Sequence, residues 1–350
     1  MEYRKLGTSG LKVSALGLGA MTFGGQTEEA DACRQLDMAL DAGITLFDTA
    51  ENYPTPTGPE TQGRSEEVLG RWIAKRGVRS RVIVATKVAG PGNAAGDMRH
   101  IRGDSRRLDA ANIAAAVDDS LRRLGTDYID LYQLHWPDRA VSTLGRSRFS
   151  QLPDDPAEVR LAETLEVLGR LVAAGKLRHI GVCNESPWGV MRCLALAETA
   201  GRPRIAAIQN GYSLLDRYFE LGLAEIAMRE AVGLIGYSPL AGGTLTGKYG
   251  AHPAALPGSR SSDHPGFVAR LSGGRLAAVQ AYAALAREHG LEPTHMALAF
   301  ARQQPFMASV LVAASNTGQL AGNLGAIGLT LPRELVQAIN AIHDANANPR

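Results

Sequence analysis

The feature that most constrains the fold of this chain is an alternation of short apolar runs with longer amphipathic stretches. The apolar runs, which predict strands, lie at residues 16–21, 45–50, 82–88, 128–135, 179–183, 205–209, 234–238 and 309–313. The stretches with helical spacing lie at 28–42, 65–76, 109–124, 157–174, 187–200, 217–232 and 274–303, with 317–326 after the last run. Strand and helix repeated eight times predict parallel strands joined by helices.

The apolar runs are nearly continuous, as in V-I-V-A-T-K-V, which is typical of strands covered on both faces. This favours a closed (β/α)8 TIM barrel, an α/β fold, over an open sheet. Glycine closes many of the helical stretches, which supports the same division of the chain; these glycines are Gly43, Gly125, Gly175, Gly201, Gly233 and Gly290. The chain contains no linker-like segment, so we expect residues 1–350 to form a single barrel domain.

The sequence also predicts where the segments outside the eight repeats lie relative to the barrel. Tyr3 to Leu6 and Leu11 to Ser14 flank G-T-S-G, which predicts a β-hairpin over the N-terminal end of the barrel. Three connections after strands are unusually long, at 89–108, 136–156 and 239–273. Loops after strand C-termini build the active-site face of a barrel. A last amphipathic helix, started by Pro332, is expected to pack outside the barrel.

Composition excludes several classes of protein. Lysine and arginine number 37 against 35 acidic residues, a balance that argues against a nucleic-acid binder. The hydrophobic share of 45% excludes a disordered chain. Three cysteines are too few for a disulfide framework or a cysteine-based zinc site, and no histidine pair has metal-ligand spacing, so we expect no metal. Without a signal peptide or a long apolar run, no membrane association and a cytoplasmic location are expected.

Four polar residues lie at or near the C-terminal ends of neighbouring predicted strands: Asp48, Tyr53, Lys87 and His135. A lysine in an apolar strand is costly to bury unless a carboxylate partners it, and Asp48 can do so. The same lysine beside a phenol is expected to lower the pKa of Tyr53 from about 10, making it a proton donor. His135 could hydrogen-bond the same substrate oxygen.

Each of these residues also has a structural interpretation. A buried Lys–Asp pair is commonly a structural ion pair, and a histidine at a strand end is commonly a hydrogen-bonded core residue. The convergence of all four on one barrel mouth favours catalysis.

Longer motifs in the chain resemble a known family. They are F-D-T-A-E-N-Y, A-T-K-V, D-Y-I-D-L-Y-Q-L-H-W-P, G-V-C-N-E, I-Q-N-G-Y-S-L-L-D-R and Y-S-P-L-A-G-G-T-L-T-G-K-Y. In this order they resemble the aldo-keto reductase superfamily, from the hairpin to the last helix. The P-E-T-Q-G segment, the long insertion after Lys87 and M-A-L-A-F-A-R-Q-Q-P-F resemble its Tas-like bacterial branch.

The resemblance implies an NAD(P)-dependent oxidoreductase that passes hydride to a small aldehyde or ketone. It implies Tyr53 as general acid, Lys87 and Asp48 as the residues that tune it, and His135 as the residue that orients the carbonyl. Asn184 and Gln209 would bind the cofactor carboxamide, and Tyr237 would stack on its ring. The cofactor phosphates would meet a glycine-containing loop. The contacts there would come from Ser238, Leu240, Gly242, Thr244, Gly247 and Lys248.

Two departures from the family pattern bear on the cofactor. Cys183 stands where the family often has serine, which weakens a hydrogen bond to the carboxamide. Residues 313–323 contain no lysine or arginine to hold the 2′-phosphate of NADP. The phosphate would instead rely on a helix N-terminus and its polar side chains. These side chains are Ser315, Asn316, Gln319 and Asn323. NADP is the expected cofactor and NAD is not excluded.

Two motifs of other protein classes are incomplete in this chain. G-G-T-L-T-G-K-Y is close to a P-loop, but Tyr249 replaces the magnesium-binding residue. Thr22 replaces the third glycine of a Rossmann fingerprint that would begin at Gly17. Two alternatives stay open: an NAD-dependent sugar or alcohol dehydrogenase on the same scaffold, and a non-catalytic nicotinamide-sensing module. Candidate walls of the substrate site are Trp136, Arg139, Phe149, Tyr212 and Phe267.

Overall fold

The centre of the molecule is a closed barrel of eight parallel strands. The computed structural model describes residues 1–350 except 92–97, 104–105, 140, 142–160, 250–272 and 350. The strands follow one another around the barrel in chain order, with the last beside the first. They are β3 (Leu16–Gly19), β4 (Leu46–Asp48), β5 (Ile83–Val88), β6 (Ile129–Leu134), β7 (Leu177–Cys183), β8 (Ile205–Gly211), β9 (Gly233–Tyr237) and β10 (Met307–Val312). The predicted (β/α)8 TIM barrel is confirmed.

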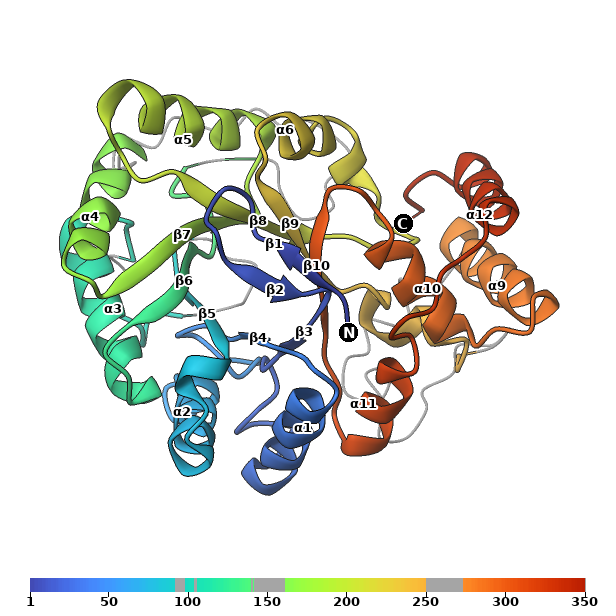
Figure 1. Ribbon diagram of the computed structural model, residues 1–350, viewed down its shortest axis with the longest axis horizontal. Coiled ribbons are helices and arrows are strands. Elements are labelled where there is room, and N and C mark those ends of the chain that lie inside the picture. The colour runs from blue at the N-terminus through green and yellow to red at the C-terminus, as the bar shows by residue number, and fades with distance from the viewer. Residues whose placement is uncertain (92–97, 104–105, 140, 142–160, 250–272, 350) are drawn as a thin grey trace.

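Helices surround the strands as an outer layer (Figure 1). They are α1 (Glu29–Asp41), α2 (Arg64–Arg76), α3 (Ala110–Leu124), α4 (Leu161–Ala173), α5 (Pro187–Ala200), α6 (Leu223–Arg229), α9 (Gly273–Glu288), α10 (Pro293–Arg302), α11 (Thr317–Leu324) and α12 (Arg333–Ala345). Three 3-10 helices are η1 (Arg79–Arg81), η2 (Tyr218–Glu220) and η3 (Ala241–Thr246). Helix α12 packs beside α9 on the outside of the ring (Figure 1).

Capping residues explain where several helices begin and end. The side chains of Asp109 and Ser186 accept hydrogen bonds from backbone N–H groups in the first turns of α3 and α5. Gly125 and Gly201 end the same two helices in the left-handed conformation. The stretch predicted at 274–303 is two helices, because Gly290 ends the first and the second begins at Pro293.

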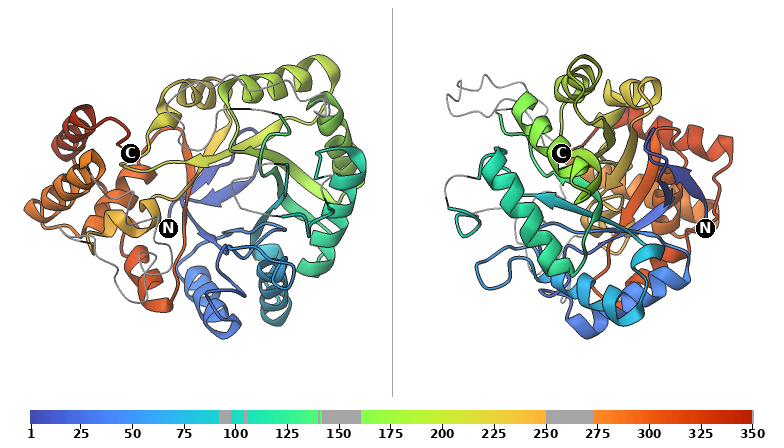
Figure 2. Two further views of the ribbon diagram at one scale, coloured as in Figure 1. Left: turned by 180° about the vertical axis from the view of Figure 1, so that it is seen from behind. Right: turned by 60° about the vertical axis from the view of Figure 1, so that its left-hand side comes forward.

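The N-terminal hairpin closes one end of the barrel. Its strands β1 (Tyr3–Lys5) and β2 (Lys12–Ser14) are antiparallel, and the hairpin lies across the barrel opening (Figures 1 and 2). Leu6 and Val13 are fully buried and join the apolar cluster that fills the barrel interior. Gly7 has φ +56°, and a Cβ atom there would lie 2.6 Å from the carbonyl oxygen of Ala206. The hairpin turn therefore needs glycine to approach the barrel this closely.

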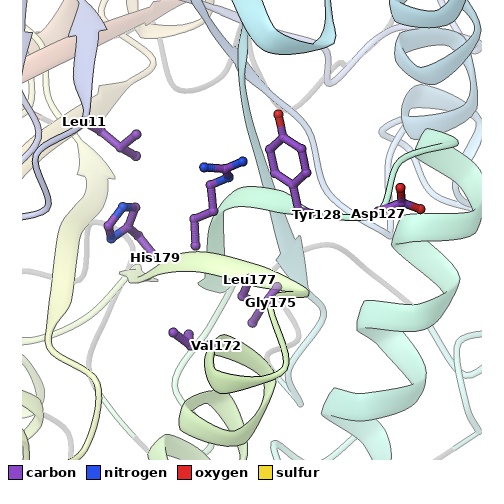
Figure 3. A pocket seen from close by; sticks show the side chains of 8 residues that line it. Leu11, Asp127, Tyr128, Val172, Gly175, Leu177 and His179 are labelled. Carbon is purple, nitrogen blue, oxygen red and sulfur yellow. The ribbon is translucent and has the colours of Figure 1, made fainter.

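A polar cluster anchors the strand beginnings at the same end of the barrel. Arg79 and Arg178 place their guanidinium carbons 3.8 and 3.9 Å from the centre of the Tyr128 ring. Asp130 accepts hydrogen bonds from Arg79 at 2.8 Å and from the backbone N–H of Val84 at 3.0 Å. An open depression beside this cluster is shown in Figure 3. It is lined by Leu11, Asp127, Tyr128, Val172, Gly175, Leu177, Arg178 and His179. Among the described helices, none is both long and apolar enough to cross a membrane.

Candidate active site

A buried ion pair lies at the C-terminal ends of β4 and β5. Lys87 is fully buried and Asp48 is 3% exposed. The ammonium group of Lys87 donates to Asp48 Oδ2 at 2.6 Å and to the carbonyl oxygen of Thr49 at 2.8 Å. Burial by itself lowers the pKa of Lys87, but the attraction of Asp48 outweighs this and raises the pKa above its usual value. Lys87 is therefore a fixed positive charge at neutral pH.

Tyr53 lies in the loop after β4, with its ring next to the Lys87 ammonium. The Nζ atom of Lys87 is 5.0 Å from the centre of the ring. Backbone bonds from Tyr53 N–H to the Ala50 carbonyl at 3.0 Å and from Gly63 N–H to the Tyr53 carbonyl at 2.9 Å fix the loop. Burial raises the pKa of Tyr53 to about 12, although Lys87 acts in the opposite direction. The sequence-based expectation of a lowered pKa is therefore wrong, because the low polarity around the half-buried phenol dominates.

His135 stands beside Tyr53 at the end of β6. The two rings meet edge to face, with their centres 5.6 Å apart. The other side of the imidazole stacks on Trp136, with ring centres at 3.8 Å and planes 13° apart. Burial and the charge of Lys87 lower the pKa of His135 well below 6.5, so the imidazole is neutral. Its Nδ1 atom is buried and has no hydrogen-bond partner within the described part of the chain.

The residues expected to bind the cofactor carboxamide form a chain of hydrogen bonds next to the Lys87–Asp48 pair. Gln209 donates from Nε2 to Asp48 Oδ1 at 2.8 Å. The thiol of Cys183 donates to Gln209 Oε1 at 3.7 Å, and burial raises its pKa to about 12. Asn184 donates from Nδ2 to the His135 carbonyl at 2.9 Å, and its Oδ1 accepts from the Tyr237 hydroxyl at 2.6 Å. The structure thus brings these side chains and the Lys87–Asp48 pair to one end of the barrel.

The loop after β9 has the backbone expected of an anion-binding segment. Ser238 follows Tyr237 with φ +57°, and Gly242, Gly243 and Gly247 have φ of +71°, +93° and +77°. These left-handed residues turn the backbone sharply within and after η3. Thr244 is buried, and its hydroxyl donates to the Ala241 carbonyl at 3.1 Å. The Leu240 carbonyl accepts from Gly243 N–H at 2.8 Å. Lys248 follows directly, with its Nζ 5.1 Å from the Tyr249 ring.

The residues expected to meet a 2′-phosphate lie at the start of α11 and on that helix. Asn316 caps it, accepting from Gln319 N–H at 2.9 Å, and Gln319 Oε1 accepts from Ser315 N–H at 3.2 Å. Asn323 is 5% exposed, and its Nδ2 donates to the Ala313 carbonyl at 3.3 Å. Three of these side chains are exposed at the surface: Ser315, Asn316 and Gln319. Asn323 is buried and instead binds the backbone just after β10.

The candidate substrate walls have different environments. Trp136 is buried against His135, and Arg139 forms an ion pair with Glu185. Tyr212 is 1% exposed and packs against Phe306 with ring centres 5.4 Å apart, so it belongs to the core. Phe149 and Phe267 lie outside the described residues.

Comparison with known proteins identifies the family. The model of the aldo/keto reductase family matches residues 15–344. The chain belongs to this family. It is 49% identical to Protein tas of Escherichia coli (strain K12) over 352 aligned residues, covering 100% of this chain and 99% of the relative. It is 32% identical to Uncharacterized oxidoreductase YrpG of Bacillus subtilis (strain 168), covering 98% and 96%. It is 29% identical to L-glyceraldehyde 3-phosphate reductase of Escherichia coli (strain K12), covering 99% and 94%.

Membership in the aldo/keto reductase family makes this chain an oxidoreductase, and the family uses nicotinamide cofactors. The residues at the barrel mouth fit such a cofactor. Gly211 pairs with Tyr237 in the sheet, and a Cβ atom there would lie 3.2 Å from Asp216 Oδ2 and 3.5 Å from the Tyr237 ring. A bare backbone at this position keeps the space between that carboxylate and the ring free of a side chain. The left-handed glycines of η3 let backbone N–H groups approach a phosphate.

Three polar residues of this aldo/keto reductase were missed in the sequence. Gln133 of β6 is fully buried and donates from Nε2 to Asp48 Oδ1 at 3.3 Å. Glu51, two residues before Tyr53, is 1% exposed and forms a two-bond ion pair with Arg102. A glutamine between apolar residues of a strand is a signal for Gln133. Glu51 stands in the motif F-D-T-A-E-N-Y, but nothing in the sequence indicates that it meets Arg102.

Proposed function

We propose that this enzyme reduces an aldehyde or ketone to an alcohol with hydride from NADPH, with Tyr53 as the proton donor. One observation carries the proposal: the buried Lys87–Asp48 ion pair lies beside a phenol and a neutral imidazole at the mouth of the barrel. Burying a charge costs folding free energy, and a charge that lies beside a proton donor can stabilise the negative charge formed when that donor loses its proton. The oxidoreductases among the relatives support the same chemistry.

The bound nicotinamide supplies the hydride that reaches the carbonyl carbon. Tyr53 donates its hydroxyl proton to the carbonyl oxygen as that oxygen gains charge. The reaction leaves a phenolate at Tyr53, which is unfavourable in a buried setting. The ammonium of Lys87 offsets this cost, and Asp48 keeps the ammonium charged and in place. The raised pKa of Tyr53 keeps the phenol protonated at neutral pH before the reaction.

His135 orients the carbonyl oxygen in this proposal. A neutral imidazole can donate one hydrogen bond, whereas an imidazolium would compete with Lys87 for the available negative charge. Burial and Lys87 hold His135 neutral. Stacking on Trp136 fixes the plane of the ring, so its nitrogen atoms have defined directions.

NADPH is the proposed cofactor, with NADH as the alternative. The N-terminus of α11 offers backbone N–H groups, and Ser315, Asn316 and Gln319 offer polar side chains to a 2′-phosphate. Residues 313–323 contain no basic side chain, and this favours weaker discrimination against NADH. The proposed substrates are small aldehydes and ketones.

The test is the Tyr53→Phe variant, assayed with NADPH and a reactive aromatic aldehyde by loss of NADPH absorbance. Removing a general acid is expected to lower the rate about 100-fold to 10,000-fold, with cofactor affinity unchanged. Tyr3→Phe is a matched control, because it removes a tyrosine hydroxyl from the N-terminal hairpin, where that hydroxyl donates to the Gly43 carbonyl. A Tyr53→Phe protein with most of the wild-type rate would show that another group donates the proton.

A further inference from the structure

Glu51 connects the loop that carries Tyr53 to the end of the strand that carries Lys87. Its backbone N–H donates to the Lys87 carbonyl at 3.2 Å. Its Oε1 atom accepts from the backbone N–H of Ala89 at 2.5 Å. Its carbonyl oxygen accepts from Gln62 Nε2 at 2.7 Å, on the far side of the Tyr53 loop. One buried residue thus fixes the spacing between two of the proposed reacting groups.

Arg102 completes the coordination of the Glu51 carboxylate. Its Nη1 donates to Oε2 at 2.6 Å and its Nη2 to Oε1 at 2.7 Å, the paired geometry that arginine alone provides. Arg102 has φ +56°, a left-handed conformation that is uncommon for a residue with a side chain. Such a conformation persists only where surrounding contacts impose it, and the paired bonds to Glu51 are such contacts.

The residues around Arg102 reach the third proposed reacting group, His135, through Trp136. Met98 and Ile101 are buried and form, with Ala89 and Trp136, an apolar cluster separate from the two larger cores. Trp136 is the residue on which the His135 ring stacks. The imidazole of His100 also lies 3.2 Å from the hydroxyl oxygen of Thr57, in the loop after Tyr53. The segment from Met98 to Arg102 therefore supports Tyr53 on one side and His135 on the other.

We propose that Arg102 is a positioning residue for this reaction: its ion pair with Glu51 holds Tyr53, Lys87 and His135 in their mutual geometry. The inference rests on the proposed function, because it assigns a role relative to the proton donor of that reaction. Arg102 touches none of the reacting atoms in this scheme. Its removal therefore lowers kcat through misplacement of the groups, while substrate binding changes little.

Arg102→Met is the test, because it keeps an unbranched apolar stem and removes both bonds to Glu51. We expect kcat to fall about 10-fold to 100-fold, since a misplacement near 1 Å can cost about 100-fold, while KM and cofactor affinity change less than about 3-fold. Arg102→Lys keeps the charge without the paired geometry and is expected to recover part of kcat. Arg102→Lys also provides the test if Arg102→Met folds poorly, because its partial recovery of kcat can then be measured on its own against wild type.

Arg79→Met is the matched control for stability. Arg79 pairs with Asp130 at 2.8 Å, and its side chain is 18% exposed and that of Asp130 8%, against 17% and 1% for Arg102 and Glu51. That ion pair lies at the opposite end of the barrel, where Arg79 also donates to the Thr126 hydroxyl and to the carbonyls of Val82 and Tyr128. Arg79→Met is expected to lower the midpoint of urea unfolding about as much as Arg102→Met, with kcat unchanged. Equal loss of kcat in both variants would overturn the proposal.

A measurement that needs neither substrate nor cofactor separates this inference from the proposed function. Hydrogen exchange at the Ala89 amide, which donates to Glu51, is expected to accelerate at least about 10-fold in Arg102→Met and not in Arg79→Met. If the wild type has no reductase activity but exchange at Ala89 still accelerates in Arg102→Met, the Glu51–Arg102 ion pair holds the loop and the proposed reaction is wrong. If the wild type is active and Arg102→Met keeps both its kcat and its slow exchange at Ala89, the role of the ion pair alone is wrong.

Discussion

The two ends of the barrel each hold an ion pair of low exposure, and the two pairs have different neighbours. At the N-terminal end, Arg79 donates to Asp130, to the hydroxyl of Thr126 and to the carbonyls of Val82 and Tyr128. Its hydrogen-bonding capacity is used on backbone and structural side chains. At the C-terminal end, Lys87 donates to Asp48 and to one carbonyl and faces the Tyr53 ring.

The polar groups at the two ends differ in how completely they are paired. Asp130 binds the backbone of a neighbouring strand, so its ion pair fixes the register of β5 beside β6. Beside Lys87, the Nδ1 atom of His135 has no partner among the described residues. Asn184, Ser238 and Ala241 adopt positive φ just after β7 and β9, at the same end. Three left-handed residues and an unpaired buried imidazole nitrogen thus lie where the strands end, which is where barrel enzymes carry their active sites.

The strongest way to break the comparison is Lys87→Met. It removes the charge that offsets phenolate formation, so we expect kcat to fall at least about 100-fold. It also leaves Asp48 buried without its cation, which is expected to cost about 3–5 kcal/mol of unfolding free energy. Urea unfolding and steady-state rates measure the two effects.

The double variant Lys87→Met with Asp48→Asn distinguishes the two effects of that change. Removing both charges is expected to restore most of the stability, because no uncompensated charge remains buried. The rate is expected to stay low. Recovery of activity in the double variant would contradict the role of Lys87 in the reaction.

Arg79→Met tests the other end. It removes hydrogen bonds between a charged donor and several acceptors, so the free energy of unfolding is expected to fall by about 2 kcal/mol. Because the barrel interior separates this site from the mouth, kcat at a temperature where the protein is folded should equal that of wild type. A several-fold loss of kcat without a change in unfolding would show that the two ends are coupled.

Asn316→Arg sharpens the comparison within the mouth itself. A charge-assisted bond to phosphate contributes about 1.5–3 kcal/mol against about 0.5–1.5 for a neutral one, so affinity for NADPH should rise roughly tenfold. Affinity for NADH should stay constant, since it lacks the 2′-phosphate. Fluorescence titration with both cofactors measures this. A wild type that already prefers NADPH a thousandfold, with no gain from the arginine, would place the phosphate elsewhere.

The smallest expected effect is that of pH on reduction. The general acid must be protonated, and the pKa of Tyr53 is raised to about 12, so the fall in rate with rising pH should begin only above pH 10. We expect kcat/KM to change less than about twofold between pH 7 and 10, because this parameter reports the free enzyme. A tenfold decline by pH 10 would mean that Lys87 lowers the pKa of Tyr53 more than burial raises it.

Much of this architecture is predictable from local sequence, and the exceptions share a cause. The strand beginning at Leu16 and the helix ending before Gly125 follow from apolar runs and a left-handed cap. The stretch predicted as one helix at 217–232 is instead the 3-10 helix η2 followed by the short α6, and Arg217 before η2 is bound by Glu220 and by Asn340 of the distant α12. Such a contact across the chain has no local signal.

The candidate site divides in the same way. Asp48, Lys87 and His135 were recognisable because polar residues at the ends of apolar strands are conspicuous, and parallel pairing brings strand ends together. The direction of the Tyr53 pKa shift was not, because it depends on how completely the folded protein encloses the phenol. The Glu51–Arg102 pair joins residues 51 positions apart through a loop, and charged residues in loops usually face solvent.

The hairpin has a consequence for the order in which the molecule can be completed. Arg4 in β1 donates to the carbonyls of Arg302 and Met307, and β3 pairs with β10 to close the barrel. During synthesis β3 can pair with β4 early, but it leaves the ribosome long before β10 exists, so its other edge stays unpaired until residue 312 has emerged. Barrel closure is therefore a late event that depends on contacts of very high sequence separation.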